Sequence, residues 1–131
     1  MHAMESVLPL FGRLLMSSLF IWEGSVQLRN SGAVGQYFAS VHVPLPAVAI
    51  WISVAIHILG GLAILLGFKT RWAAGLLALL CLGTAFWVHL RPGDPSNLLH
   101  FYKNLVMAGG FLYVIAFGAG RISIDGDHAA Q

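Results

Sequence analysis

Three polar residues gather at the start of the last apolar segment of this 131-residue chain. Lys103 and Asn104 follow His100 by three and four residues, a spacing that puts all three on one face of a helix. An ammonium group and an amide can donate hydrogen bonds to ligand oxygens, and an imidazole that titrates near neutral pH can carry a proton. Because a lysine inside a membrane helix must find a polar partner or reach water, this face is a candidate binding surface.

Other polar side chains are predicted to lie at a similar depth in the other helices. Glu23 and Gln27 are four residues apart and share a helix face, and His89 ends the third apolar run. His57 lies well inside the second run, about 16 Å along a helix axis. Because ionisable groups in hydrocarbon cost roughly 2.5–3.5 kcal/mol each, we expect these side chains to face the interior of a helical bundle and to line one polar pocket that opens outward.

Within this pocket we expect His57 and His100 to carry protons. The remaining members are expected to bind a ligand, and they are Glu23, Gln27, His89, Lys103 and Asn104. The simplest arrangement pairs Glu23 with Lys103. Three alternatives stay open: the pair could be a purely structural ion pair, His89 and His100 could bind loop carbonyls at the membrane surface, and His57 could be a hydrogen-bonded core residue.

A histidine–carboxylate metal site is a further alternative. His57, His89 and His100 together with Glu23 have the ligand types that suit zinc, iron or copper. No two of these histidines have the i, i+3 or i, i+4 spacing of a helical metal motif, so no metal ligands are assigned. The sequence has no covalent cofactor motif, and Cys81, its single cysteine, is expected to be a buried inert thiol.

The composition indicates that a lipid bilayer surrounds these residues. Hydrophobic residues make up 58% of the chain and charged residues only 9%, and the mean hydropathy is +0.81. A soluble domain carries roughly a quarter charged residues. The formal net charge of +2 comes from a few loop residues, so we expect no nucleic-acid partner.

We expect a single all-α domain, an integral membrane up-down four-helix bundle. Its predicted spans cover residues 7–28, 47–68, 72–90 and 98–119. Short links make neighbouring helices antiparallel, and glycines within the spans are expected to allow close helix packing. In the one sizeable loop, QYFASV is expected to form a short interfacial helix. Arg13 is expected to extend toward the inner membrane surface, and the tail from Arg121 onward is expected to fray.

Basic residues in the short loops suggest an orientation. Lys69 and Arg71 lie between the second and third spans, and Arg121 follows the fourth, on the side of the N-terminus. Arg29 and Arg91 lie on the opposite side. Because basic loops stay in the cytoplasm, we expect both termini to be cytoplasmic.

Four apolar motifs follow one another along residues 10–118. They are GRLLMSSLFIWEG, YFAS-x-x-VPLP, ILGGLAILLGFKTR and HFYKNLVMAGGFL. Their order and spacing resemble the DoxX family of small four-helix bacterial membrane proteins. The family-like positions are Arg13, Gly60, Gly61, Arg71, Lys103 and Asn104. Many relatives carry a carboxylate at the position of His57 and a lysine near Gln27, so the resemblance implies either different chemistry here or a charge pair that has moved to Glu23 and Lys103.

The resemblance implies a bacterial inner-membrane protein that is associated with redox proteins, since the family is named after a subunit of a thiosulfate:quinone oxidoreductase. Our first hypothesis is a redox-associated component, a subunit of a quinone-linked oxidoreductase, whose pocket binds a quinone-like molecule. Electron transfer would then need a soluble or membrane redox partner. The alternatives are a non-catalytic membrane subunit or anchor for a partner protein, and a small-solute carrier that would require a homo-oligomer.

Overall fold

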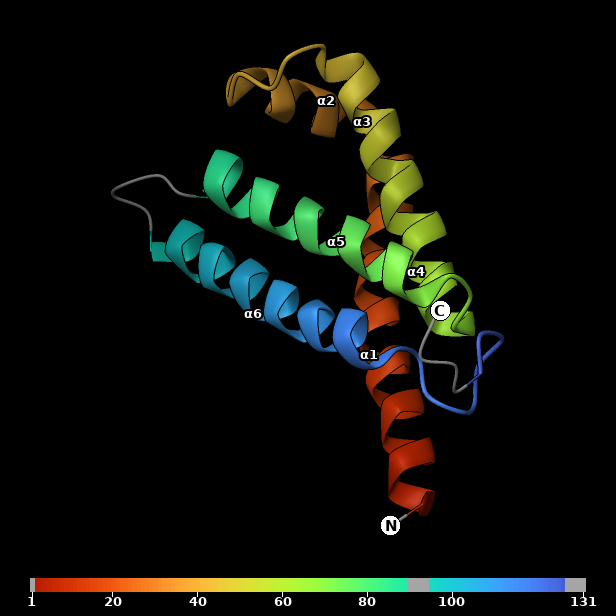
Figure 1. Ribbon diagram of the computed structural model, residues 1–131. Helices are drawn as coiled ribbons and strands as arrows, with labels where there is room; N and C mark the ends of the chain where they lie inside the picture. Colours follow the sequence, from red (N-terminus) through yellow and green to blue (C-terminus); the bar gives the residue numbers. More distant parts are fainter. Residues whose placement is uncertain (1, 90–94, 127–131) are drawn as a thin grey trace.

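The computed structural model describes residues 2–89 and 95–126, and these ranges contain helices and no strand (Figure 1). The first half of the chain forms α1, a short α2, and a continuous helix built of three parts. The bounds are α1 His2–Arg29, α2 Ser31–Ser40, α3 Pro46–Ala55, the π-helical turn η1 Ile56–Gly60, and α4 Gly61–Leu66. The second half forms a hairpin of α5 Thr70–Thr84, the π-helical turn η2 Ala85–His89, and α6 Pro95–Phe117.

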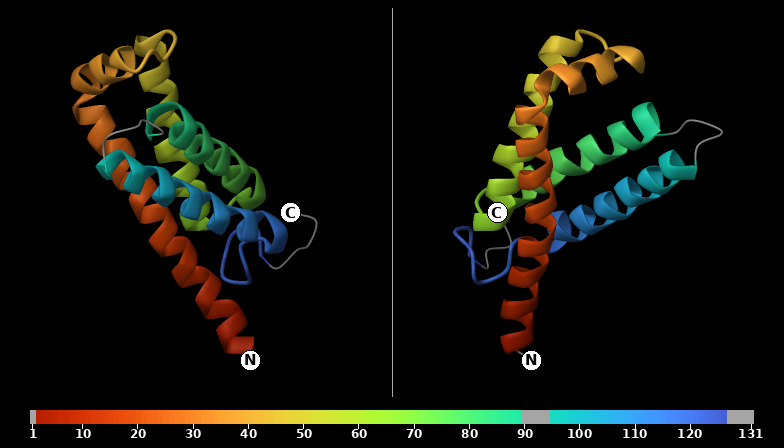
Figure 2. Two further views of the ribbon diagram at one scale, coloured as in Figure 1. Left: turned by 90° about the vertical axis from the view of Figure 1, so that its left-hand side faces the viewer. Right: turned by 180° about the vertical axis from the view of Figure 1, so that it is seen from behind.

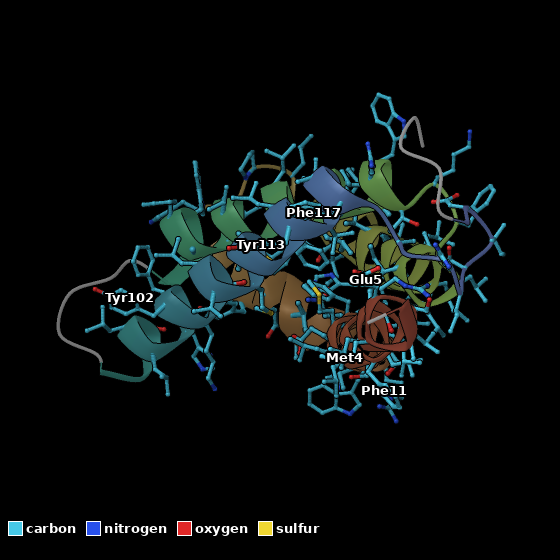
Figure 3. The ribbon with its side chains drawn as sticks, turned by 60° about the horizontal axis from the view of Figure 1, so that its bottom comes forward. Met4, Glu5, Phe11, Tyr102, Tyr113 and Phe117 are labelled. Carbon is cyan, nitrogen blue, oxygen red and sulfur yellow. The ribbon has the colours of Figure 1, made fainter. Side chains whose placement is uncertain are left out.

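Four of the helical segments in the described ranges are long and apolar enough to cross a membrane. They are Ala3–Arg29, Pro46–Leu66, Thr70–Trp87 and Asn97–Phe117. The prediction of an all-α membrane protein is therefore confirmed. Apolar side chains project from the outer faces, as Tyr102, Tyr113 and Phe117 do along α6 (Figure 3), where they are 57%, 71% and 75% exposed. Such faces suit contact with acyl chains.

The four spans are arranged as two antiparallel pairs that are splayed apart. One pair is α1 with the continuous helix of α3, η1 and α4, and the other is α5 with α6 (Figures 1 and 2). The two pairs meet in a hydrophobic core. Each span contributes a large side chain that is at most 4% exposed, and these side chains are Phe20, Ile64, Leu77 and Phe111. Away from this core the second pair turns outward from the first at a steep angle. The bundle is thus closed at the core and open beside α2.

Close packing within the first pair depends on small residues. A Cβ atom on Gly24 would lie 2.7 Å from Ile58, and one on Gly61 would lie 2.8 Å from Ile21. These glycines allow the two helices to approach closely, as predicted. The same prediction is wrong for three glycines whose added Cβ would meet nothing within 4 Å, namely Gly12, Gly83 and Gly109.

Arg13 does not extend to the membrane surface, contrary to the prediction. It is 3% exposed, and one guanidinium nitrogen donates to the carbonyl oxygens of Ile64 and Leu65, at 3.2 and 3.1 Å. The other terminal nitrogen donates to the carbonyl of Ile122. The last turn of a helix leaves carbonyls without helical partners, and Arg13 supplies donors to them at the end of α4.

The tail through residue 126 is ordered, so the expectation of fraying is wrong there; the tail beyond it lies outside the described residues. The backbone of Ile124 and Asp125 donates to the carbonyls of Leu66 and Gly67. The Asp125 carboxylate in turn accepts hydrogen bonds from the backbone of Lys69 and Thr70, at 2.9 and 2.8 Å, and so caps α5. We call the contacts of Arg13 and residues 122–125 with residues 64–70 the C-terminal clasp.

The predicted interfacial helix is present and is longer than QYFASV. It is α2, which lies across the molecule beyond the end of α1 (Figure 1). The preceding stretch SGAVG forms its first half. Tyr37 is 45% exposed on this helix.

Candidate functional site

A cleft of about 1280 Å³ lies where the two helical pairs diverge. Its walls come from α1, α2, α3, η1, α5, η2 and α6. Most of the lining side chains are apolar, and Phe20, Trp22, Tyr37 and Phe38 provide aromatic surface. Such a space, mostly apolar with a few polar groups, is typical of a site for a small organic ligand.

The polar residues singled out in the sequence converge on this cleft. Its lining includes Glu23, Gln27, His57, His100, Lys103 and Asn104. His89 ends the π-helical turn η2, and its side chain lies outside the described residues. The side chains therefore come from three spans that are far apart in sequence.

The deepest polar part of the cleft is a hydrogen-bonded chain of three buried side chains. Ser53 Oγ donates to Gln27 Oε1 at 2.8 Å, and His57 Nδ1 lies 2.7 Å from the carbonyl oxygen of Ser53 and 3.3 Å from its Oγ. The three residues are 8–9% exposed. We call Gln27, Ser53 and His57 the floor of the cleft.

Ser53 is a site residue that was not identified from the sequence. Serine is common in membrane helices, and here it stands in a strongly apolar run. Its spacing of four residues from His57 was the available signal, because side chains at i and i+4 meet on one helix face. Its contact with Gln27 depends on how α3 packs on α1, which no local pattern gives.

His57 also sits in an unusual stretch of backbone. It belongs to η1, the π-helical turn that interrupts the helix between α3 and α4. The second such turn, η2, carries Trp87 at the opposite wall of the cleft. π-Helical turns are rare and occur frequently at functional sites.

The α6 wall is more open than the floor. His100 and Lys103 are exposed, and Asn104 Nδ2 donates to the His100 carbonyl at 3.0 Å. No ion pair joins Lys103 to Glu23 in the described part of the chain, so the expected pairing is not formed. Glu23 lies instead on the α1 wall of the cleft, on the same helix as Gln27. The splay of the two helical pairs separates the α1 and α6 walls.

One hydrogen bond braces the cleft beside α2. The indole nitrogen of Trp87 donates to the carbonyl of Val41 at 3.1 Å, which links η2 to the residue that follows α2. Trp87 is also one of the lining residues. The brace therefore joins the second helical pair to the first at the end where they are otherwise apart.

The described side chains do not support the metal alternative. Among them, no three histidine, cysteine, aspartate or glutamate side chains lie close enough to hold a metal ion. His57 and His100 belong to opposite walls, and Cys81 is a buried free thiol in α5. The cleft offers hydrogen-bond donors, acceptors and a cation rather than a coordination site.

Comparisons with known proteins agree with this fold. The chain is 39% identical to the inner membrane protein YqjF of Escherichia coli over 128 residues, which cover 95% of each chain. It is 34% identical to the inner membrane protein YphA of the same organism over 128 residues, 94% of this chain and 91% of the relative. A more distant relative, the ER-derived vesicles protein ERV29 of Saccharomyces cerevisiae, is 30% identical over 80 residues, 57% of this chain and 26% of that protein.

No solved structure matches the chain significantly. The profile of the DoxX family matches residues 8–90, from α1 to the end of the third span. The matched region includes the first three spans from residue 8 onward and the floor of the cleft, and it ends before α6. Together with the two full-length relatives, this match means that the chain belongs to the DoxX family.

Proposed function

We propose that this protein binds a lipid-soluble, quinone-like molecule in the cleft between its two helical pairs. The observation that carries the proposal is that the six polar side chains singled out from the sequence, which come from three spans, line one mostly apolar cleft between membrane-spanning helices. Such a site matches a ligand with an apolar body and a few oxygen atoms. The cleft is large enough for a substituted ring and the start of an alkyl chain.

Each wall has a distinct part in this proposal. The apolar and aromatic side chains hold the ring, and Trp22 and Trp87 flank it. At the open side the exposed ammonium of Lys103 donates to a ring oxygen, and the side-chain carbonyl oxygen of Asn104 accepts from a ring hydroxyl when the ligand carries one. His57 and His100 exchange protons with them.

The cellular setting is part of the same proposal. We infer a single four-span domain in the bacterial inner membrane, since both full-length relatives are named inner membrane proteins. Lys69, Arg71 and Arg121 favour cytoplasmic termini. Electron transfer to or from the bound molecule would take place with a redox partner, because the sequence has no cofactor motif of its own.

The test is equilibrium binding of a decyl-substituted benzoquinone to the purified protein in lipid nanodiscs, followed by quenching of tryptophan fluorescence. We expect saturable binding to the wild type and about tenfold weaker binding to Lys103→Met, because a charge-assisted hydrogen bond is lost. The matched control is Arg29→Met, which removes an exposed positive charge that does not line the cleft. Equal affinity in wild type and Lys103→Met, or quenching no greater than in empty nanodiscs, would refute the proposal.

A further inference from the structure

The hydrogen bonds at the floor of the cleft fix the position of a proton on His57. Its Nδ1 atom lies 2.7 Å from the backbone carbonyl oxygen of Ser53. A carbonyl oxygen can only accept a hydrogen bond, so Nδ1 must carry the hydrogen. In the neutral ring Nε2 is then an acceptor, and none of the described residues supplies a hydrogen-bond partner for it.

The same contact orients the rest of the floor. Because Nδ1 is a donor, Ser53 Oγ can accept from it at 3.3 Å and direct its own hydrogen to Gln27 Oε1 at 2.8 Å. The Gln27 amide nitrogen is thus left to donate. Since both side chains contact the Ser53 hydroxyl, one short hydrogen-bonded chain carries an acceptor, His57 Nε2, and a donor, the Gln27 amide, for which the described residues supply no partner.

These two groups do not bind a hydroxyl group and a carbonyl group of a ligand equally well. A ring hydroxyl matches both, because it donates to His57 Nε2 while its oxygen accepts from the Gln27 amide. A ring carbonyl matches only the amide and would leave Nε2 without a partner, and a buried polar group without a partner is unfavourable.

We infer that the floor selects a ring hydroxyl, so that the cleft prefers the reduced, quinol form of its ligand to the oxidised form. This inference rests on the proposed function. Within it His57 is the residue that determines specificity. Ser53 is a positioning residue, since it acts through the orientation of the Gln27 amide and the tautomer of His57.

The binding test uses two rings that do not undergo redox exchange, 4-butylphenol and 4-butylanisole, titrated by calorimetry against the protein in detergent with an empty-micelle blank. We expect the wild type to bind the phenol roughly tenfold more tightly. In His57→Phe the preference should fall to less than about threefold, because the acceptor is gone. If the anisole bound weakly only because of its extra methyl group, the preference would persist in His57→Phe and the inference would be wrong.

A second pair of variants tests Ser53. Ser53→Ala should lose several-fold in phenol affinity because the Gln27 amide is no longer oriented, and Ser53→Thr should restore it. Ser17→Ala is the matched control: Ser17 is also buried in a span, but it bonds the Leu14 carbonyl and does not line the cleft. An equal loss in Ser17→Ala and Ser53→Ala would count against a specific role for Ser53.

A measurement without ligand completes the test. Nitrogen-15 NMR of histidine-labelled protein, with the His57 signal assigned from His57→Phe, should find Nδ1 protonated in the wild type and in Ser53→Ala, which keeps the backbone carbonyl. A proton on Nε2 in the neutral ring would overturn the inference. If neither ring binds the wild type, the proposed function fails and the inference fails with it, whereas equal binding of both rings removes the inference alone.

Discussion

The C-terminal clasp and the floor of the cleft use polar side chains in opposite ways. In the clasp, Arg13 donates to backbone carbonyls at the end of α4, and Asp125 accepts from the backbone amides at the start of α5. In the floor, the described residues supply no hydrogen-bond partner for the Gln27 amide nitrogen or for His57 Nε2. The first arrangement ties the tail to the end of α4, although Arg13 Nε itself has no hydrogen-bond partner among the described residues, and the second has its unpaired groups at the cleft.

The difference shows why burial alone does not distinguish a functional polar residue in a membrane helix. Arg13 and His57 are both buried, at 3% and 8% exposed. Arg13 donates to carbonyls at the end of α4 and to the Ile122 carbonyl in the tail, and so ties the two together; its role is structural. His57 has one ring nitrogen bonded to its own helix and the other free, beside a cleft. The partners of each buried group decide between the two roles.

The largest effect should follow from breaking the clasp. Arg13→Met removes charge-assisted hydrogen bonds to three carbonyls and should lower the free energy of unfolding by at least about 3 kcal/mol. Arg29→Met, at an exposed site, should cost less than about 0.5 kcal/mol. Thermal unfolding in detergent compares the two variants. Equal stability would mean that the clasp contributes nothing and that the contrast between the two regions is wrong.

Replacing Asp125 should have a smaller effect on the free energy of unfolding, and this effect should depend on pH. Burial raises its pKa, but the hydrogen bonds from Thr70 and Lys69 outweigh burial and leave the pKa below its usual value. The carboxylate therefore stabilises the fold above about pH 4, and this contribution is lost as the pH falls through the lowered pKa.

Asp125→Asn should cost about 1 kcal/mol at pH 7 because a helix cap is weakened. The difference in unfolding free energy between wild type and Asp125→Asn should shrink as the pH is lowered below about 4. Chemical denaturation at several pH values measures it. A difference that stays constant down to pH 2 would contradict the capping role.

The smallest change in stability is expected in the cleft. Trp87→Phe keeps an aromatic ring and removes the part-buried hydrogen bond to the Val41 carbonyl, which should cost about 0.5 kcal/mol. Because this brace joins the two helical pairs, amide hydrogen exchange should rise in α2 and stay unchanged in the clasp. Faster exchange in residues 64–70 would show that the brace at Trp87 and the C-terminal clasp are coupled, and it would contradict the view that the clasp and the cleft are separate regions.

Much of the arrangement followed from local patterns. The apolar runs predicted the four candidate spans, and helical spacing put Glu23 with Gln27, and His100 with Lys103 and Asn104, on shared faces. These assignments held because hydropathy and helical periodicity are properties of one segment at a time. The predicted convergence on one pocket agrees with the lining of the cleft, although the Glu23–Lys103 ion pair did not form.

The tertiary structure alone decided the rest. The steep angle between the helical pairs opened the cleft, the packing of α3 on α1 brought Ser53 to Gln27, and the tail closed onto residues 64–70. Each of these contacts joins segments that are distant in sequence, as Arg13 and Ile122 are. Amino-acid type and spacing set which face of a helix is polar, but only the packing of whole helices sets which group that face meets.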